Sequence, residues 1–426
     1  MRFNGFDDEW IEEKLGNLVQ IKSGECTKNL ITGIDNSIPY FKVEQLNNSL
    51  KYQIKTPYFI NDKSKIVNKG SIIFPKRGAA ILLNKIRILN QDSFMDTNLM
   101  TLTPNNKLYN EFLYYFIYKE NLSKIADTTS IPQLNNKHIK PYPIKLPSFE
   151  EQLKISKFIS SVDKKVALLS QNLEIFNDFK KGLLQQIFTQ KLRFKDTENN
   201  LYPNWEFLHL KDIITLNGGY AFKSELFKDE GIPIIRISNI SQDNSVVAND
   251  LVYYDKLKND HKFIIKKGEL IIAMSGATTG KVAVYDFEQI SYINQRVGLF
   301  KQISNKLYYP FLIQYSLSNS FKKELQKTLV AGAQPNISKK EIEEFKIDLP
   351  YYEEQKKIAD LLHNIDLKIN SIKKQTFEIS EFKKGLLQQM FVVRINWRCN
   401  FKLAKSPSFN KHLLILKNKI IFIIIK

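Results

Sequence analysis

A glycine- and threonine-rich run is the first segment whose residue types could do chemistry. Residues 275–282 read Ser-Gly-Ala-Thr-Thr-Gly-Lys-Val and resemble a phosphate-binding loop. Such a loop needs four residues between its glycines and a hydroxyl residue after its lysine to hold a magnesium ion. Here three residues separate the glycines, and Val282 stands where the hydroxyl is needed. We therefore interpret the run as a glycine turn between two strands.

Other catalytic arrangements are also missing from the sequence. DNA methyl transfer would need a glycine-rich cofactor loop and an Asn/Asp-Pro-Pro-aromatic loop for a flipped base, and the only glycine pair is Gly218-Gly219. The five histidines do not form ligand pairs. The two cysteines, Cys26 and Cys399, stand far apart, which excludes a disulfide framework and indicates a reducing compartment. We therefore expect a chain with no catalytic residue, no metal site and no bound cofactor.

The chain repeats itself at an offset of 203 residues. Residues 146–152 (LPSFEEQ) recur as 349–355 (LPYYEEQ), and residues 180–188 (KKGLLQQIF) recur as 383–391 (KKGLLQQMF). From the proline of each copy to the last phenylalanine there are 17 identities in 42 positions. Upstream, the order of features is kept but the residues have diverged. We interpret this as two copies of one scaffold that carry two different binding specificities.

Both constant segments place apolar residues at alternating steps of four and three, as coiled-coil helices do. A helix of about 40 residues is roughly 60 Å long and cannot bury its apolar seam alone. We expect the two helices to pair antiparallel within the chain, with dimerisation or packing on their own domains as the alternatives. Gly182 and Gly385 inside the pattern suggest a close approach or a local break. The predicted seam comprises Ile155, Ile159, Val162, Val166, Leu169, Leu173, Phe176, Ile358, Leu362, Ile365, Ile369, Ile372 and Ile379.

The two variable regions contain short β-branched and aromatic runs between turns, which predicts mixed sheet domains. The expected fold class is α+β, with two tandem α/β domains separated by two long antiparallel coiled-coil helices and related by a pseudo-two-fold internal repeat. The expected parts are a first domain (1–147), a first helix (148–190), a linker (191–204), a second domain (205–350), a second helix (351–391) and an atypical basic and apolar tail (392–426).

Composition and charge set the broad class of the protein. The proportions of apolar residues (43%) and charged residues (25%) are those of globular proteins and exclude global disorder. The net charge of +19 among 426 residues indicates an anionic partner only weakly, because the tail alone carries eight Lys/Arg and no acid. The sequence offers neither an uninterrupted apolar run long enough to cross a membrane nor a signal peptide at its start. We therefore expect a cytoplasmic protein.

The doubled signature resembles a known family. Variable domains that each end in Leu-Pro-x-x-x-Glu-Gln, followed by a heptad helix that closes with Lys-Lys-Gly-Leu-Leu-Gln-Gln, are similar to the specificity subunit of type I restriction–modification systems. The resemblance covers about residues 10–391. The run at 332–337 (GAQPNI) also looks like the family's small-x-Gln-x-x-Ile run.

The resemblance implies a DNA-binding chain that performs no chemistry itself. Each variable domain would be a target-recognition domain that reads one half of a split, asymmetric site in double-stranded DNA, while the helices fix the spacer. Two modification (methyltransferase) subunits carrying S-adenosylmethionine would methylate adenine, and restriction subunits using ATP and Mg²⁺ would translocate and cleave DNA. No membrane partner is implied. The alternative is a non-catalytic duplicated coiled-coil interaction protein without DNA specificity.

Candidate DNA contacts are the residue types that hydrogen-bond to base edges and phosphates. For each of them, a solvated surface group or a turn former is the alternative interpretation. Gln334 and the pair Lys76–Arg77 rank first, because they lie in corresponding loops of the repeat. The candidates are Lys76, Arg77 and Gln133 in the first domain and Arg236, Asn239, Ser275, Thr278, Lys281, Gln295, Arg296 and Gln334 in the second.

The tail departs from the family's pattern, in which the chain would be expected to stop near Phe391. Residues 392–426 combine basic residues with a run of isoleucines near the end. A frameshift product, a disordered basic arm and an interfacial amphipathic segment are the three interpretations, and we favour a shifted reading frame.

Overall fold

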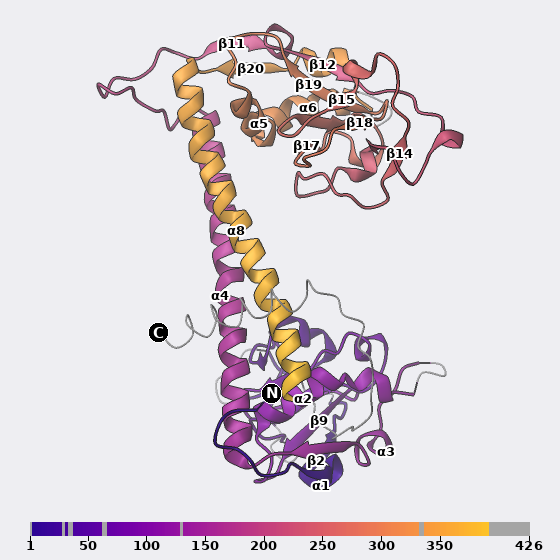
Figure 1. The fold of residues 1–426 in the computed structure, drawn as a ribbon. Helices are drawn as coiled ribbons and strands as arrows, with labels where there is room; N and C mark the ends of the chain where they lie inside the picture. The colour runs from indigo at the N-terminus through magenta and orange to yellow at the C-terminus, as the bar shows by residue number, and fades with distance from the viewer. Residues whose placement is uncertain are drawn as a thin grey trace. The chain divides into compact units, whose positions relative to one another are not determined.

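A computed structural model describes residues 2–27, 30–32, 37–61, 66–127, 131–331 and 336–391. The chain divides into two compact units. The first unit takes in Met1–Asp163 and Glu381–Lys426, and the second unit is Lys164–Ser380. Each unit therefore joins one mixed domain to the beginning of one long helix and the end of the other (Figure 1). Gln334 and the tail at 392–426 lie outside the described residues.

The first unit is built on short strands that alternate with turns. The strands are β1 (Ile11–Lys14), β2 (Val19–Ser23), β3 (Ile38–Phe41), β4 (Tyr52–Gln53), β5 (Phe59–Ile60), β6 (Ile72–Pro75), β7 (Arg87–Leu89), β8 (Phe94–Met95), β9 (Leu99–Pro104) and β10 (Pro143–Leu146). The short helices are α1 (Leu15–Leu18), α2 (Asn110–Glu120) and α3 (Asn136–Ile139). The strands form a five-stranded sheet in the order β2-β9-β6-β7-β4, a three-stranded sheet β5-β3-β8 and a ribbon β1-β10.

The second unit has the same plan. Its strands are β11 (Glu206–His209), β12 (Ile214–Gly218), β13 (Ile232–Ile235), β14 (Val252–Tyr254), β15 (Ile264–Ile265), β16 (Leu270–Ala273), β17 (Val282–Val284), β18 (Ser291–Ile293), β19 (Val297–Gln302) and β20 (Lys346–Leu349). Its shorter helices are α5 (Tyr309–Leu317), α6 (Asn319–Ala331) and α7 (Lys339–Glu343). The sheet orders are β12-β19-β16-β17, β14-β13-β18-β15 and β11-β20.

Strand pairing identifies the equivalent elements of the two units. β6 pairs antiparallel with β7 and β9, as β16 does with β17 and β19. β3 pairs parallel with β8, as β13 does with β18. The ribbon β1-β10 corresponds to β11-β20. The predicted α+β internal repeat is therefore confirmed.

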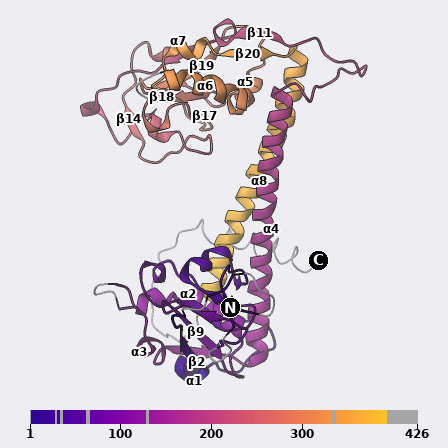
Figure 2. The same ribbon diagram turned by 180° about the vertical axis from the view of Figure 1, so that it is seen from behind.

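Two long helices, α4 (Phe149–Phe188) and α8 (Tyr352–Met390), run side by side in opposite directions (Figures 1 and 2). In the second unit Lys180 of α4 contacts Asp366 of α8, while Ile187, closer to the end of α4, shares a core with Ile358, near the start of α8. Along the predicted seam, Ile155, Ile159, Val162, Leu169, Ile358, Leu362, Ile365, Ile369 and Ile372 are buried, and Val166, Leu173, Phe176 and Ile379 are half-buried.

The glycines inside the helices behave differently from our expectation. Both helices continue without a break through Gly182 and Gly385, and a Cβ added at either position would meet nothing within 4 Å. The expectation of a close approach or a local break was therefore wrong. Hydrogen bonding along each helix tolerates a glycine at a modest cost in stability.

A buried glutamate fastens the start of each helix to its own domain. In the first unit Glu151 accepts hydrogen bonds from the Nε of Arg2 at 3.0 Å and the indole of Trp10 at 3.1 Å. In the second unit Glu354 accepts them from the Nε of Arg193 at 2.8 Å and the indole of Trp205 at 3.1 Å. Both carboxylates are almost fully buried. We call these two clusters the helix joints.

The neighbouring glutamine completes each joint. The amide nitrogen of Gln152 donates to the carbonyls of Pro147 and Lys107, and its oxygen accepts from the backbone N–H of Tyr109 at 2.8 Å. Gln355 makes the same three bonds, to Pro350, Lys306 and Tyr308. A side chain that satisfies three buried backbone groups is costly to replace. These bonds explain why the second glutamate and the glutamine of the signature are the same in both copies.

The far end of each long helix packs on a shorter helix of the other domain, α5 in the second unit and α2 in the first. Phe188 of α4 lies 5.5 Å from the ring of Phe311 and 5.8 Å from Tyr315 in the second unit. Phe391, directly after α8, lies 5.0 Å from the ring of Phe112 in the first unit. Each domain therefore takes part of its apolar core from the helix that belongs to the other repeat.

Candidate nucleic-acid interface

Three segments of the first domain meet at one edge of the five-stranded sheet. The loop that joins β6 to β7 contains Lys76 and Arg77, and Arg77 pairs as an isolated bridge with Gln133. The backbone N–H of Leu134 donates to the carbonyl of Lys76 at 2.8 Å, and the N–H of Lys76 donates to the carbonyl of Asn98 at 2.8 Å. We call residues 76–86, 96–98 and 131–134 the first hairpin edge. It brings together all three candidate residues predicted in this domain.

The three candidate residues of this edge differ in their exposure. Arg77 and Gln133 are exposed, whereas Lys76 is half-buried. Burial lowers the pKa of the Lys76 ammonium, and the nearby Asp96 carboxylate partly opposes this shift. The edge therefore presents a guanidinium and a side-chain amide on paired residues.

The second domain forms an equivalent edge. The N–H of Met274 donates to the carbonyl of Arg296 at 2.9 Å, and the N–H of Ile337 donates to the carbonyl of Met274 at 2.9 Å. Arg296 also donates through its guanidinium to the hydroxyl of Ser275 at 3.1 Å. Gln295 and Arg296 are exposed. We call residues 274–281, 294–296 and 336–337 the second hairpin edge.

The glycine-rich run forms the hairpin loop of this second edge. It connects β16 to β17, and Gly276 and Gly280 have positive φ angles of 78° and 82°. The interpretation as a turn between two strands is therefore confirmed. Ser275 is buried, whereas Thr278 and Lys281 are half-buried on the loop.

Two further candidates of the second domain, Arg236 and Asn239, hydrogen-bond to backbone groups of their own loop. Asn239 is 1% exposed, and its amide nitrogen donates to the carbonyls of Val247 and Asn249. Its oxygen accepts the backbone N–H of Arg236 at 3.0 Å. Arg236 itself is half-buried and donates to the carbonyl of Asp250. The side chain of Asn239 makes its hydrogen bonds to the backbone of its own loop. The prediction that Asn239 contacts a base was therefore wrong, and the residue has a structural role.

A glycine in each domain allows two backbones to approach at the hairpin edge. A Cβ at Gly24 would lie 1.8 Å from the carbonyl oxygen of Asp96, and one at Gly219 would lie 2.2 Å from that of Asn294. The N–H of Gly24 donates to the carbonyl of Leu99, as the N–H of Gly219 does to Val297. No side chain larger than hydrogen fits at either place without a backbone shift.

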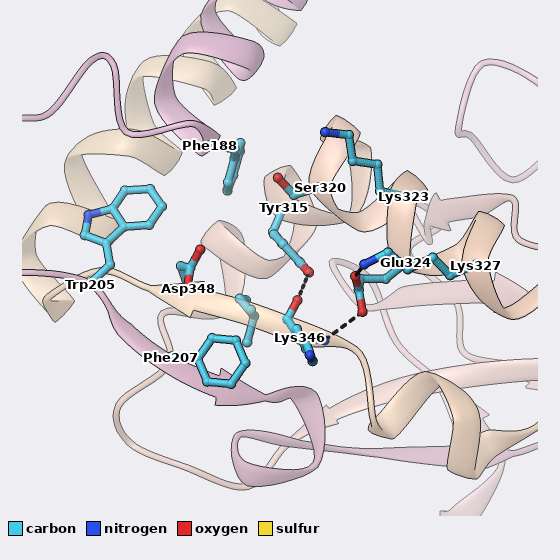
Figure 3. Close-up of a pocket in the computed structure, with 11 residues that line it drawn as sticks. Phe188, Trp205, Phe207, Tyr315, Ser320, Lys323, Glu324, Lys327, Lys346 and Asp348 are labelled. Carbon is cyan, nitrogen blue, oxygen red and sulfur yellow. Dashed lines mark hydrogen bonds and ion pairs between the residues drawn. The ribbon is translucent and has the colours of Figure 1, made fainter.

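A cavity of about 190 Å³ lies elsewhere in the second unit (Figure 3). Phe188, Trp205 and Phe207 line one side of it and the lysines of α6 the other. The Tyr315 hydroxyl donates to the carbonyl of Lys346 at 2.6 Å, and burial raises the pKa of this hydroxyl. Among the charged groups that line the cavity, Glu324 and Lys327 form an ion pair, and the ammonium of Lys346 lies over the ring of Phe207.

Within the described residues, no three or more His, Cys, Asp or Glu side chains gather in a group able to hold a metal ion. In the same part of the chain, no helix is long and apolar enough to cross a membrane.

Comparison with known families agrees with this architecture. The sequence model described as the type I restriction modification DNA specificity domain matches residues 7–175 and again residues 202–381. The two matches together cover most of the chain and fall on the two repeats. The chain belongs to the family of type I restriction–modification specificity subunits.

Specificity subunits of similar length are found among its relatives. The MjaVIII specificity subunit of Methanocaldococcus jannaschii is 27% identical over 405 residues, which cover 91% of this chain and 93% of the relative. A putative type I specificity subunit of Mycoplasma pneumoniae is 22% identical, over 90% of this chain and 96% of the relative. The solved S subunit from M. genitalium has 17% sequence identity and a TM-score of 0.60, over 92% of this chain and 98% of that chain. The last comparison supports the fold.

Several structural residues of this specificity subunit escaped the sequence reasoning. Arg2, Trp10 and Gly24 were not singled out, nor were Arg193, Trp205 and Gly219 as partners in the joints and edges. A signal was available, because Trp10 and Trp205 are 195 residues apart, as are Gly24 and Gly219. That is the offset at which the two diverged copies begin to align.

Proposed function

We propose that the two domains each read one half of a split, asymmetric target in double-stranded DNA. The observation that carries this proposal is the duplicated hairpin edge in a chain of the DNA-specificity family. Arg binds guanine O6 and N7 with two hydrogen bonds, and Gln binds adenine N6 and N7 in the same way. The exposed Arg77–Gln133 pair and the exposed Gln295–Arg296 pair have the chemistry for this readout.

We also propose that the chain directs adenine methylation or DNA cleavage by partner subunits and carries no chemistry itself. Two modification subunits would hold S-adenosylmethionine, and restriction subunits would hold ATP and Mg²⁺. The curated relatives are named specificity subunits of type I restriction enzymes, which supports this division of labour. Leu168, Ile175 and Phe179 of α4 are each more than half exposed and offer an apolar stripe for a modification subunit. The assembly would act in the cytoplasm.

The test is a genome-wide map of N6-methyladenine in cells that carry a compatible modification subunit, with and without this chain. We expect a new split motif with a methylated adenine in each half and a fixed gap. No new motif would favour the alternative, an interaction protein without DNA specificity.

Variants assign the halves to the two edges. R77A/Q133A is expected to relax or abolish the first half of the motif, and Q295A/R296A the second half. Each lost bidentate contact removes about 1–3 kcal/mol of discrimination. K211A is the matched control, because Lys211 is exposed, pairs with Glu344, and precedes β12 at the end of the sheet away from the hairpin edge. It should leave both halves unchanged.

A further inference from the structure

The hairpin loops of the two edges differ in one chemical respect. The loop between β16 and β17 carries Ala277, Thr278 and Thr279 between its glycines, so its tip is small and polar. The loop between β6 and β7 carries Leu82 and Leu83 instead, and their exposed fractions are 53% and 65%. Two consecutive exposed leucines therefore lie in the same loop as Lys76 and Arg77.

The structure holds this loop in place rather than leaving the leucines to collapse. Ile81, the preceding residue, is 3% exposed and anchors the loop in the core. The N–H of Leu82 donates to the carbonyl of Ala79 at 3.1 Å, in a tight turn. Asn84 follows with a positive φ of 46°, and its side-chain amide donates to the carbonyl of Tyr118 at 3.0 Å. The turn is therefore fixed on both sides of the two leucines.

The position of the leucines suggests what they meet. They share a hairpin loop with Arg77, at the edge of the sheet where Arg77 pairs with Gln133. A DNA helix that lies against those polar groups would bring its groove floor to the same loop. The apolar group that a base pair displays in the major groove is the C5-methyl of thymine. Apolar side chains recognise that methyl group by contact.

We propose that Leu82 and Leu83 contact thymine methyl groups in the first half-site, so that this half contains at least one A·T pair chosen through its methyl group. This inference rests on the proposed function of the domains as DNA readers. The second edge carries Ala277, Thr278 and Thr279 at its loop tip in place of the leucines, so only the first half-site depends on Leu82 and Leu83.

The test replaces thymine by uracil, which keeps base pairing and removes one methyl group. The assembled complex of this chain with its modification subunits is titrated with duplexes that carry the mapped target, with each thymine position of either strand changed in turn. Burial of one methyl-sized group corresponds to about a fourfold change in affinity. We expect this loss at one or two positions of the first half.

A double-mutant design links the effect to the two leucines. In L82A/L83A, the uracil substitutions should no longer weaken binding, because the partner of the methyl group is already gone. L201A is the matched control, since Leu201 is 62% exposed in the linker, and it should keep the wild-type sensitivity to uracil.

The outcomes separate this inference from the proposed function. Specific binding that ignores every thymine-to-uracil change in the first half would overturn the role of the leucines and leave DNA reading intact. Loss of modification subunits from L82A/L83A in a pull-down would reassign the leucines to a protein contact. Absence of any sequence-specific binding by the wild-type complex would instead sink the proposed function.

Discussion

The helix joints and the hairpin edges are both present twice in this molecule. The two joints have kept the same side-chain contacts, whereas the two edges have not. At the joints, Glu151 and Glu354 bind an arginine and a tryptophan each, in the same geometry. At the edges, Arg77 pairs with Gln133 in one unit, whereas Arg296 bonds to Ser275 in the other. The joint must satisfy the same buried groups in both units. The edge need only keep its backbone frame, so its side chains are free to differ.

Removal of the joint carboxylates should have the largest effect in both units, and E354A should cost the more of the two, because Glu354 also accepts the N–H of Phe194 and Arg193 is less exposed than Arg2. E151A and E354A each leave an arginine and an indole N–H without their buried partner, which typically costs about 3–5 kcal/mol. Urea denaturation of each variant measures the loss in free energy of unfolding. E353A is the control, because Glu353 is exposed and pairs only with Lys356, and it should cost less than about 0.5 kcal/mol. A large effect in one unit alone would contradict the equivalence of the joints.

The glycines of the hairpin edges test whether the two edges share the same backbone packing although their side chains differ. G24A and G219A both force a Cβ into a backbone carbonyl, so we expect each to destabilise its domain by about 1–3 kcal/mol through a backbone shift. Thermal unfolding monitors the loss. G182A and G385A are matched controls in open helical positions, and they should stabilise by about 0.5–1 kcal/mol. Neutral behaviour of G24A or G219A would show that the edges relax more easily than the frame suggests.

An ion pair between the long helices repeats in both units with a different third partner. Lys180 binds Asp366 at 2.6 Å, with Gln314 donating to the same carboxylate, whereas Lys383 binds Asp163 at 2.6 Å, with the Tyr115 hydroxyl donating. Double-mutant cycles on each pair should give coupling energies of about 1 kcal/mol, since these groups are partly buried. The coupling should weaken in high salt. A coupling near zero in one unit would show that the third partner decides the strength of the pair.

Alkaline pH should reveal a small difference between the two domains. Tyr40 on β3 occupies the place of Ile234 on β13. Burial, aided by the Asp96 carboxylate, raises the pKa of the Tyr40 hydroxyl to about 12. A folded-state pKa above the unfolded value stabilises below pH 10, and this contribution is lost as the pH rises from 10 to 12.

The measurement is the free energy of unfolding as a function of pH, followed in the first unit. Wild-type protein should lose stability between pH 10 and 12, and Y40F should lose less over that interval. At pH 7 the variant lacks only the hydroxyl's bond to the carbonyl of Glu25 and should be nearly as stable as the wild type. Parallel pH curves for the two proteins would exclude Tyr40 as the source.

The helices and the glycine turn could be predicted from the sequence, because regular spacing of apolar residues and repeated motifs indicate packing that occurs in both copies. The seam of Ile155, Ile159 and Val162 was visible in the spacing, and the turn at 275–282 followed from its glycines. Arg77 and Gln133 were both named from the sequence as candidate DNA contacts, but their pairing was visible only in the structure.

Other features could not be predicted from the sequence, because they depend on contacts that form only when the chain folds. Asparagine is a residue type that can bind a base edge, but Asn239 is buried and its side chain makes three hydrogen bonds within its own loop. Gly24 is fixed by the carbonyl of Asp96, which is remote in sequence. Arg2 hydrogen-bonds to Glu151, although 149 positions separate the two residues in the sequence. Residue type indicates what a side chain can bind, and only the fold decides what it does bind.

The sharing of helix ends sets an order for biosynthesis. The first domain packs Phe112 and Phe116 against Phe391, which is among the last described residues of the chain. A ribosome adds about 5–20 residues per second, so the whole second unit takes on the order of ten to forty seconds to emerge before this contact can form. During that interval the nascent first domain displays an unfilled aromatic surface. The first domain therefore cannot complete its core until the final helix is made.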